Sequence, residues 1–423
     1  MSFAELDIPR EHINTVIYLD EMADKLGQSV SIDWDAPDKE IAADLIKLAS
    51  KIEKYGENSA YPVGAVYWGT DIDGRKFILP TVNTIPDRIK DHLPEGEERI
   101  GYGENDSHAT AHAEMVGINI MPKIKEVSLA LRVSPCTTCQ EGLSVFSSSH
   151  HHSGHINAIY FDDSTLEEPA AKKLWQYSSK MLPEIAKNGK IGLFSIDTDT
   201  AEIKKEIAPI HNEGHKDVLI ENPVQVQVLL DVKSFDEIDT SEILLMTKRA
   251  AKKSTIPNNK EATTLITEVD GKFIAITAAA ALPPGFKASE SKQHFEHDEN
   301  TKKRTYKYVM DALKRCKMTA KALGLNTQNS MAVCTRTPTS GMLINAVLYG
   351  VDKLVTKSEY KLEHMFNNNP DADKDTTLLA LTIGNNDTPP IIKHLHATQN
   401  DSAQKKIHKP ELIRKNREHE PHN

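Results

Sequence analysis

An internal repeat is the feature of this sequence that most constrains its fold. The turn and strand "DGRKFI" of the first half returns in the second half as "DGKFI" at 270–274. A second pair of segments also matches, because "SMAVCTRTPTSGMLINAVL" lies well over "SLALRVSPCTTCQEGLSVF" and places Pro338 on Pro135. The repeat predicts two copies of one folding unit within the 423 residues. A chain of this length can bury a separate core in each copy.

Each copy alternates strands with helices. Residues 38–54 carry apolar side chains at helical spacing, and residues 61–82 predict a β-hairpin. Strands near 126–134, 156–161 and 190–196 are separated by helical segments, which together predict a three-layer α/β domain. We expect these parts of the chain: an N-terminal extension 1–35, a first domain 36–200, a linker 201–235, a second domain 236–385 and a flexible tail 386–423.

The composition restricts the class of protein. Hydrophobic residues make up 39% and charged residues 26%, which is typical of a globular protein, and no apolar run approaches the ~20 residues that cross a bilayer. No secretory signal is visible, and four cysteines do not make a disulfide framework at this size, so we expect a cytoplasmic protein. The net charge of −10 argues against a broad nucleic-acid-binding surface.

Two short motifs carry chemistry. "TAHAE" contains His112 and Glu114, and "SPCTTC" contains Cys136 and Cys139. One histidine and two cysteines can hold a zinc ion and leave the fourth position for water. Glu114 can then accept a proton and return it to a leaving amine, as in the H-x-E…P-C-x-x-C signature of hydrolytic deaminases. We therefore expect one Zn²⁺ per chain and a zinc-dependent hydrolase.

The alternative is a structural zinc site in a non-catalytic scaffold. A structural site usually has a fourth protein ligand, and the first domain contains no further cysteine. A structural site also has no use for Glu114. Both motifs are expected to begin helices, whose positive ends would favour thiolates.

The segments "YPVGAVYW…DGRKFI…N…TAHAEM…PCTTC" resemble the cytidine deaminase-like superfamily over roughly residues 38–196. "PVGAV" with "TAHAE" resembles the branch that contains the tRNA adenosine, guanine, cytosine and deoxycytidylate deaminases. The resemblance implies a duplicated three-layer α/β/α deaminase fold with a mixed five-stranded sheet. A long helix between the strands at 156 and 190 implies that these two strands run parallel, as in that branch.

The resemblance also implies a substrate pocket. Asn83, Ala113 and Ser134 are expected to contact substrate, although the glutamate partner that free-cytidine deaminases place near the asparagine is missing from "NTIP". Asp162 or Asp163 is expected either to bind an amino group of the base or merely to cap the following helix. The loop between Asn83 and His112 is long and is expected to lie beside the pocket.

The expected reaction replaces an exocyclic amine of a cytosine or purine base with oxygen, in a free nucleobase, nucleoside or nucleotide. The alternative substrate is RNA or single-stranded DNA, with the second domain as a binding platform. Basic residues within 302–321 favour either a solvated helix face or a contact to phosphates. The histidine-rich loop 147–155 is expected to be solvated rather than metal-binding.

The second copy retains the pattern and loses the chemistry. At the position of the paired cysteines it has "PTSGM" at 338–342, and "HFE" at 294–296 resembles a remnant of the first motif. Cys316 and Cys334 are expected to be buried thiols. We therefore expect a degenerate domain that packs on the first as an intramolecular pseudo-dimer, with a homodimer as a further expectation.

Overall fold

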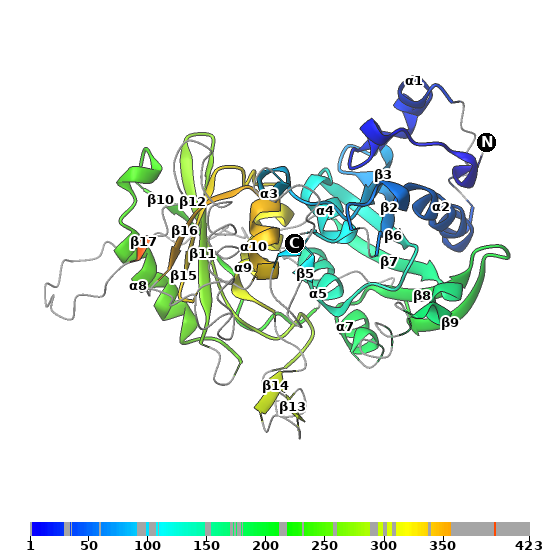
Figure 1. Ribbon diagram of the computed structural model, residues 1–423. Coiled ribbons are helices and arrows are strands. Elements are labelled where there is room, and N and C mark those ends of the chain that lie inside the picture. The colour runs from blue at the N-terminus through cyan, green and yellow to red at the C-terminus, as the bar shows by residue number, and fades with distance from the viewer. Residues whose placement is uncertain are drawn as a thin grey trace, which may run out of the picture.

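The structure is a computed structural model, and the part of the chain that it describes contains two α/β units. Each unit is built on one mixed sheet, and the two are joined in the middle of the molecule by helices (Figure 1). The residues described are 2–28, 34, 36–58, 61–90, 99–100, 107–108, 110–148, 154–169, 172, 175, 179, 181–210, 218–230, 232–256, 260–287, 295–298, 303–306, 310–336, 340–356 and 393–394.

The first unit contains a seven-stranded sheet in the order β1-β3-β2-β6-β7-β8-β9. Pairing is antiparallel from β1 to β6, parallel from β6 to β8 and antiparallel again at β9. The parallel pairing of β7 with β8 confirms the expectation from the intervening helical segment. The strands are β1 Ile17–Tyr18, β2 Gly64–Asp71, β3 Lys76–Val82, β6 Ile124–Leu131, β7 His155–Asp162, β8 Gly192–Asp197 and β9 Glu202–Ala208.

The second unit contains a six-stranded sheet in the order β10-β12-β11-β15-β16-β17. Strands β10, β12, β11 and β15 pair antiparallel to one another in this order, and β15, β16 and β17 pair parallel. The strands from β1 to β8 of the first sheet pair in the same order of directions. The two sheets therefore share one topology over six strands. The strands are β10 Gln225–Leu229, β11 Ala262–Val269, β12 Lys272–Ala279, β15 Ser330–Cys334, β16 Val351–Thr356 and β17 Lys393–His394.

The expectation of five strands per sheet was wrong at the sheet edges. The N-terminal extension supplies β1, which pairs with β3 and is followed by the short helix α1 (Met22–Leu26). The predicted linker supplies β9 to the first sheet and β10 to the second. An edge strand of a sheet exposes unpaired backbone N–H and C=O groups. The N-terminal extension and the predicted linker therefore gain backbone hydrogen bonds by adding strands at these edges.

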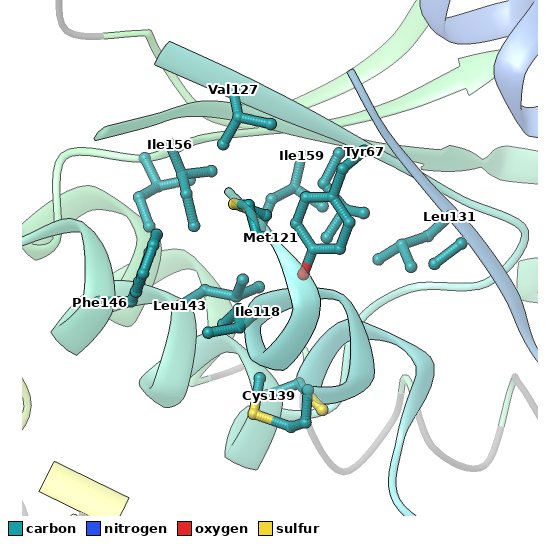
Figure 2. Packing of buried hydrophobic residues seen from close by; sticks show 14 of the residues in the cluster. Tyr67, Ile118, Met121, Val127, Leu131, Cys139, Leu143, Phe146, Ile156 and Ile159 are labelled. Carbon is teal, nitrogen blue, oxygen red and sulfur yellow. The ribbon is translucent and has the colours of Figure 1, made fainter. Parts of the chain in front are cut away.

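Helices cover both faces of the first sheet. The apolar side chains of α2 (Asp38–Ile52) pack on Val66 and Trp68 of β2. The helices α4 (Ala113–Ile120), α5 (Thr137–Ser147) and α7 (Leu182–Asn188) cover the opposite face with a second cluster. Figure 2 shows the Tyr67 ring within this cluster and Cys139 at its edge. Successive side chains of β2 therefore serve two cores, as a strand covered on both faces requires.

The second unit is layered in the same way. The helix α8 (Thr240–Ala251) packs on one face of its sheet, while α9 (Ala312–Ala322) and α10 (Ser340–Leu348) lie on the other. Figure 1 shows α9 and α10 between this sheet and the helices α3 (Asp87–Lys90), α4 and α5 of the first unit. Two small hairpins complete the described strands: β4 Arg99–Ile100 with β5 Ser107–His108, and β13 Phe295–Asp298 with β14 Lys303–Tyr306.

Apolar clusters cross between the two units. Tyr349 and Met318 of the second unit belong to the core that contains Tyr67, and Ile85 and Val116 of the first unit belong to the core under α9. Burying apolar side chains across a contact stabilises it in the same way as a domain core. The two units are thus packed as a pair.

Two predictions for the second unit need correction. The helix predicted within 302–321 begins only at Ala312, because residues 303–306 form β14. Arg315 and Lys317 are buried, so neither lies on a solvated face or is available to a phosphate. Arg315 donates to the carbonyls of Ala279 and Asn222, and the ammonium group of Lys317 lies over the ring of Tyr349.

The prediction that "HFE" at 294–296 is the remnant of the first motif was also wrong. An isolated bridge joins Thr84 to Ala111 just before α4, and the matching bridge joins Ala281 to Met310 just before α9. The position of His112 is therefore occupied in the second unit by Asp311, which caps α9.

Several expectations fall outside the described residues. They concern Pro338, His294, most of the loop before α4, the histidines at 150–152, and the tail 386–423 apart from β17. Among the described helices, none has the length and apolarity needed to cross a membrane.

Lys317 generates a prediction about stability. Burial lowers the pKa of Lys317 to about 7, from 10.5 in an exposed lysine. Between these values the unfolded chain binds more protons than the folded chain, so stability rises with pH, and the cost of burying the charge is largest below pH 7. We expect Lys317→Met to raise the melting temperature by about 2–4 °C or more below neutral pH, and to have little effect near pH 10.5.

Thermal unfolding followed by circular dichroism at both pH values measures this difference. Lys252→Met is the matched control, because this lysine is exposed in the same unit and its loss should change neither value. An equal effect of Lys317→Met at both pH values would contradict the prediction.

Candidate metal centre

The first turn of α4 presents His112 and Glu114. His112 has extended backbone angles and forms the N-cap, so its ring lies before the helix and Glu114 lies within its first turn. Two buried hydroxyls fix this turn from the sheet: Thr81 donates to the carbonyl of Ala113 at 3.0 Å, and Tyr67 donates to the carbonyl of Glu114 at 2.7 Å. The turn is therefore attached to β2 and β3 by directional contacts as well as by packing.

The first turn of α5 presents the two cysteines. Cys136 forms the N-cap, and its sulfur accepts a hydrogen bond from the backbone N–H of Cys139 at 3.4 Å. The side chain of Cys139 is buried, whereas that of Cys136 is partly exposed. Both motifs begin helices, as the sequence predicted.

The three side chains converge on one point. The Nδ1 atom of His112 lies 3.5 Å from the sulfur of Cys136 and 3.3 Å from the sulfur of Cys139. All three ligand atoms lie within 4.8 Å of one another, so the group can hold a metal ion. Tetrahedral zinc with ordinary bond lengths separates nitrogen from sulfur by about 3.6 Å, which fits both distances. No other described histidine, cysteine, aspartate or glutamate joins this cluster.

The charges of the three groups are coupled. The Cys139 thiol and the His112 ring donate to the Cys136 sulfur and lower the pKa of Cys136. The negative charge on Cys136 in turn raises the pKa of His112 to about 9, and burial raises the pKa of Cys139. A divalent cation bound between these groups would deprotonate the ligands that coordinate it.

Glu114 is only 4% exposed and lies beside the cluster. Burial is the main reason that the pKa of its carboxyl group is raised, with a further contribution from the negative charge of Cys136. A carboxyl group with a raised pKa can both accept and return a proton near neutral pH.

A pocket opens onto these residues. His112, Glu114 and Cys136 lie on its wall, and the ring of His112 is accessible from outside. Predicted contacts Asn83, Ala113 and Ser134 also line it. The remaining lining residues, which the sequence interpretation did not single out, are Asn58, Tyr61, Val63, Thr110 and Val133.

Asn83 has a structural task at the pocket. Its Oδ1 atom accepts from the backbone N–H of Val63 at 3.0 Å, and its Nδ2 atom donates to the carbonyl of Tyr61 at 3.2 Å. Asn58 accepts from the N–H of Tyr61 at 3.0 Å. These contacts hold 61–63 as a loop, which is why β2 starts at Gly64 and not at Tyr61 as predicted. Asn58 before β2 and Asn83 after β3 were the sequence signals for this loop.

Ser134 is buried at the pocket, and its hydroxyl has no hydrogen-bond partner among the described residues. Unsatisfied buried hydroxyls are rare in proteins, and a polar ligand is one way to satisfy them. Ser134 thus brings a hydroxyl that could bond to a polar ligand to the wall of the pocket.

Asp162 and Asp163 lie outside the lining of the described pocket, and their contacts are with other parts of the chain. Asp162 caps the short helix Asp163–Glu167 by accepting from the N–H of Ser164. Asp163 accepts from the hydroxyl of Ser195 at 2.6 Å and lies 3.5 Å from the ammonium group of Lys205. Neither residue lines the described pocket. The capping alternative describes Asp162 correctly.

The cysteines of the second unit lie apart from the cluster. Cys316 and Cys334 are fully buried, and burial raises the pKa of each to about 12. Both therefore stay protonated at neutral pH, as expected for thiols in a core.

No model of a known protein family matches the chain, and no curated protein matches it.

We expect metal analysis of the purified protein to find one transition-metal ion per chain. Cys139→Ser should abolish binding, because a neutral hydroxyl replaces a thiolate ligand. Cys334→Ser is the matched control and should retain the metal. Mass spectrometry of the metal content measures all three proteins, and two ions per chain would refute a single site.

Proposed function

We propose that the protein is a zinc-dependent hydrolytic deaminase. It replaces the exocyclic amine of a cytosine or purine base with oxygen and releases ammonia, and its substrate is a free nucleobase, nucleoside or nucleotide. The observation that carries this proposal is the convergence of His112, Cys136 and Cys139 in an accessible pocket that also contains the buried carboxyl group of Glu114.

The ligand set favours zinc. Two sulfurs and one imidazole suit zinc better than magnesium or calcium, which prefer oxygen. Structural zinc sites usually have four protein ligands, whereas catalytic sites have three and keep a position open. The described cluster has three members and an accessible histidine. When bound there, zinc supplies a Lewis acid that lowers the pKa of water to about 7.

Glu114 is assigned the proton transfers. It lies outside the group of three ligands but in the same pocket. Its raised pKa suits a group that accepts a proton from water and later donates it to the departing amine. Burying a carboxyl group is costly and the three ligands do not require it, so a scaffold protein would gain nothing from Glu114.

The pocket supports a flat heterocyclic substrate. Val63, Ala113 and Val133 offer apolar contacts, while Asn83 and the unsatisfied hydroxyl of Ser134 offer polar ones. Mostly apolar pockets with a few convergent polar groups are typical of sites for small organic molecules. The burial of Arg315 and Lys317 removes part of the basic surface that would have favoured a nucleic acid.

The two units support a duplicated deaminase fold in which only the first copy is active. Their sheets share pairing order and direction over six strands, and the parallel pairing of β7 with β8 is the arrangement that the sequence resemblance implied. Asp311 and Leu313 stand where the first copy has His112 and Glu114. This replaces the assignment of "HFE" as the remnant motif.

We expect Glu114→Ala to retain zinc and the fold but to lose about 10²–10⁴-fold in turnover, because general acid–base catalysis typically contributes that factor. Glu126→Ala, an exposed glutamate of β6, is the matched control. Metal content and rate are measured on the same samples. A variant of Glu114 that keeps wild-type turnover would exclude its assigned role.

The substrate class is tested by measuring ammonia release from wild-type protein with nucleobases, nucleosides, nucleotides and short oligonucleotides. We expect turnover of at least one free base, nucleoside or nucleotide. Activity confined to oligonucleotides would support the nucleic-acid alternative, and zinc binding without any ammonia release would contradict the deaminase proposal.

A further inference from the structure

The second unit touches both helices that present the candidate metal ligands. The helix α9 packs along α5, and Tyr349 at the end of α10 packs under α4. Asn119 of α4 donates to the carbonyl of Leu348 at 3.0 Å, and Arg88 forms an ion pair with Asp352. Both metal-binding motifs therefore have neighbours in the second unit.

Lys314 on α9 reaches the first turn of α5. Its ammonium group donates to the carbonyl of Thr138 at 3.1 Å, and Thr138 stands between Cys136 and Cys139 in the sequence. The carboxylate of Glu141 lies 3.9 Å from the same ammonium group, and the two side chains are only 11% and 9% exposed. The stem of Lys314 runs past Gly142 of α5, where an added Cβ atom would lie at ordinary contact distance, 3.8 Å, from the Cδ atom of Lys314.

Tyr349 reaches the first turn of α4 in a comparable way. Its hydroxyl is buried and donates to the carbonyl of Met115 at 3.1 Å. Thr81 and Tyr67 donate to the two preceding carbonyls, of Ala113 and Glu114. Three successive carbonyls of this turn thus accept from three hydroxyls, two of the first unit and one of the second.

We propose that Lys314 and Tyr349 of the second unit are positioning residues for the metal centre of the first unit. They hold the first turns of α5 and α4 at the separation at which His112 meets the two cysteines. The positive charge of Lys314 also lies against the turn that presents both cysteines. This proposal depends on the metal centre of the proposed function but not on the reaction or its substrate.

The proposal follows from how metal affinity depends on ligand position. The donors come from two separate helices, so any freedom in the spacing of α4 and α5 must be removed when the metal binds. Residues that fix the ligands in advance reduce this cost, and loss of such outer contacts typically lowers metal affinity by about 10–100-fold. A hydrogen bond donated by a charged group, such as the ammonium group of Lys314, is also stronger than one between two neutral groups.

The test measures the zinc affinity of the full-length protein by competition with a chromophoric chelator. We expect Lys314→Met to bind zinc about 10–100-fold more weakly than wild type. Lys314→Arg, which keeps the charge and a donor, should retain most of the affinity. Tyr349→Phe removes a single neutral hydrogen bond and should weaken binding by roughly two- to tenfold. Lys252→Met removes an exposed charge from the same unit and should bind as wild type does.

A purely structural role would lower the melting temperature of the metal-free protein without changing zinc affinity, so unfolding is measured alongside. Wild-type affinity in both Lys314→Met and Tyr349→Phe would overturn the proposal. If Lys314→Met does not fold, the zinc affinities of Tyr349→Phe and Lys314→Arg test the proposal instead. Wild-type zinc affinity in Tyr349→Phe would then overturn the proposal. A wild-type protein that binds zinc but deaminates nothing would refute the proposed reaction and leave this proposal standing.

Discussion

The convergence of two helix N-termini on one point is the constraint on which the rest of the structure depends. α4 and α5 must both begin where His112 meets Cys136 and Cys139, and neither helix alone contains the set. The sheet supplies the frame, because the hydroxyl groups of β2 and β3 bind the first turn of α4. The crossover from β6 through α5 to the parallel strand β7 brings the cysteines to the same edge of the sheet. The site is thus a product of the topology.

The relation between the two units follows from this constraint. The second unit repeats the six-strand topology, and its helix α9 begins with Asp311 at the position of His112. The helices α9 and α10 of the second unit form a packing surface for the first unit. Lys317 is buried there at a cost in stability, with its ammonium group over the ring of Tyr349. Retention of the copy is explained if it supports the first unit.

The pocket illustrates how one side chain can serve two purposes. The resemblance implied that Asn83 contacts substrate, and the structure places it on the pocket wall, but its amide also holds the loop 61–63. The loop carries Tyr61 and Val63 into the pocket. A change at Asn83 would therefore alter the shape of the pocket as well as one polar contact. Ser134, with its unsatisfied hydroxyl, is the simpler candidate for recognition.

Local pattern by itself determined the helices and strands around the motifs and the parallel strands β7 and β8, since apolar periodicity and crossover length are properties of neighbouring residues. The two short motifs also named the three ligand residues, which the fold then brings together. Only the tertiary structure decided the rest. The edge strands β1, β9 and β10 pair with strands of the two sheets. Asp162 and Asp163, at the end of β7, accept hydrogen bonds from Ser164 and Ser195. Lys314 meets Thr138 across 176 positions of sequence. Such contacts arise from the packing of whole units, and no short segment encodes them.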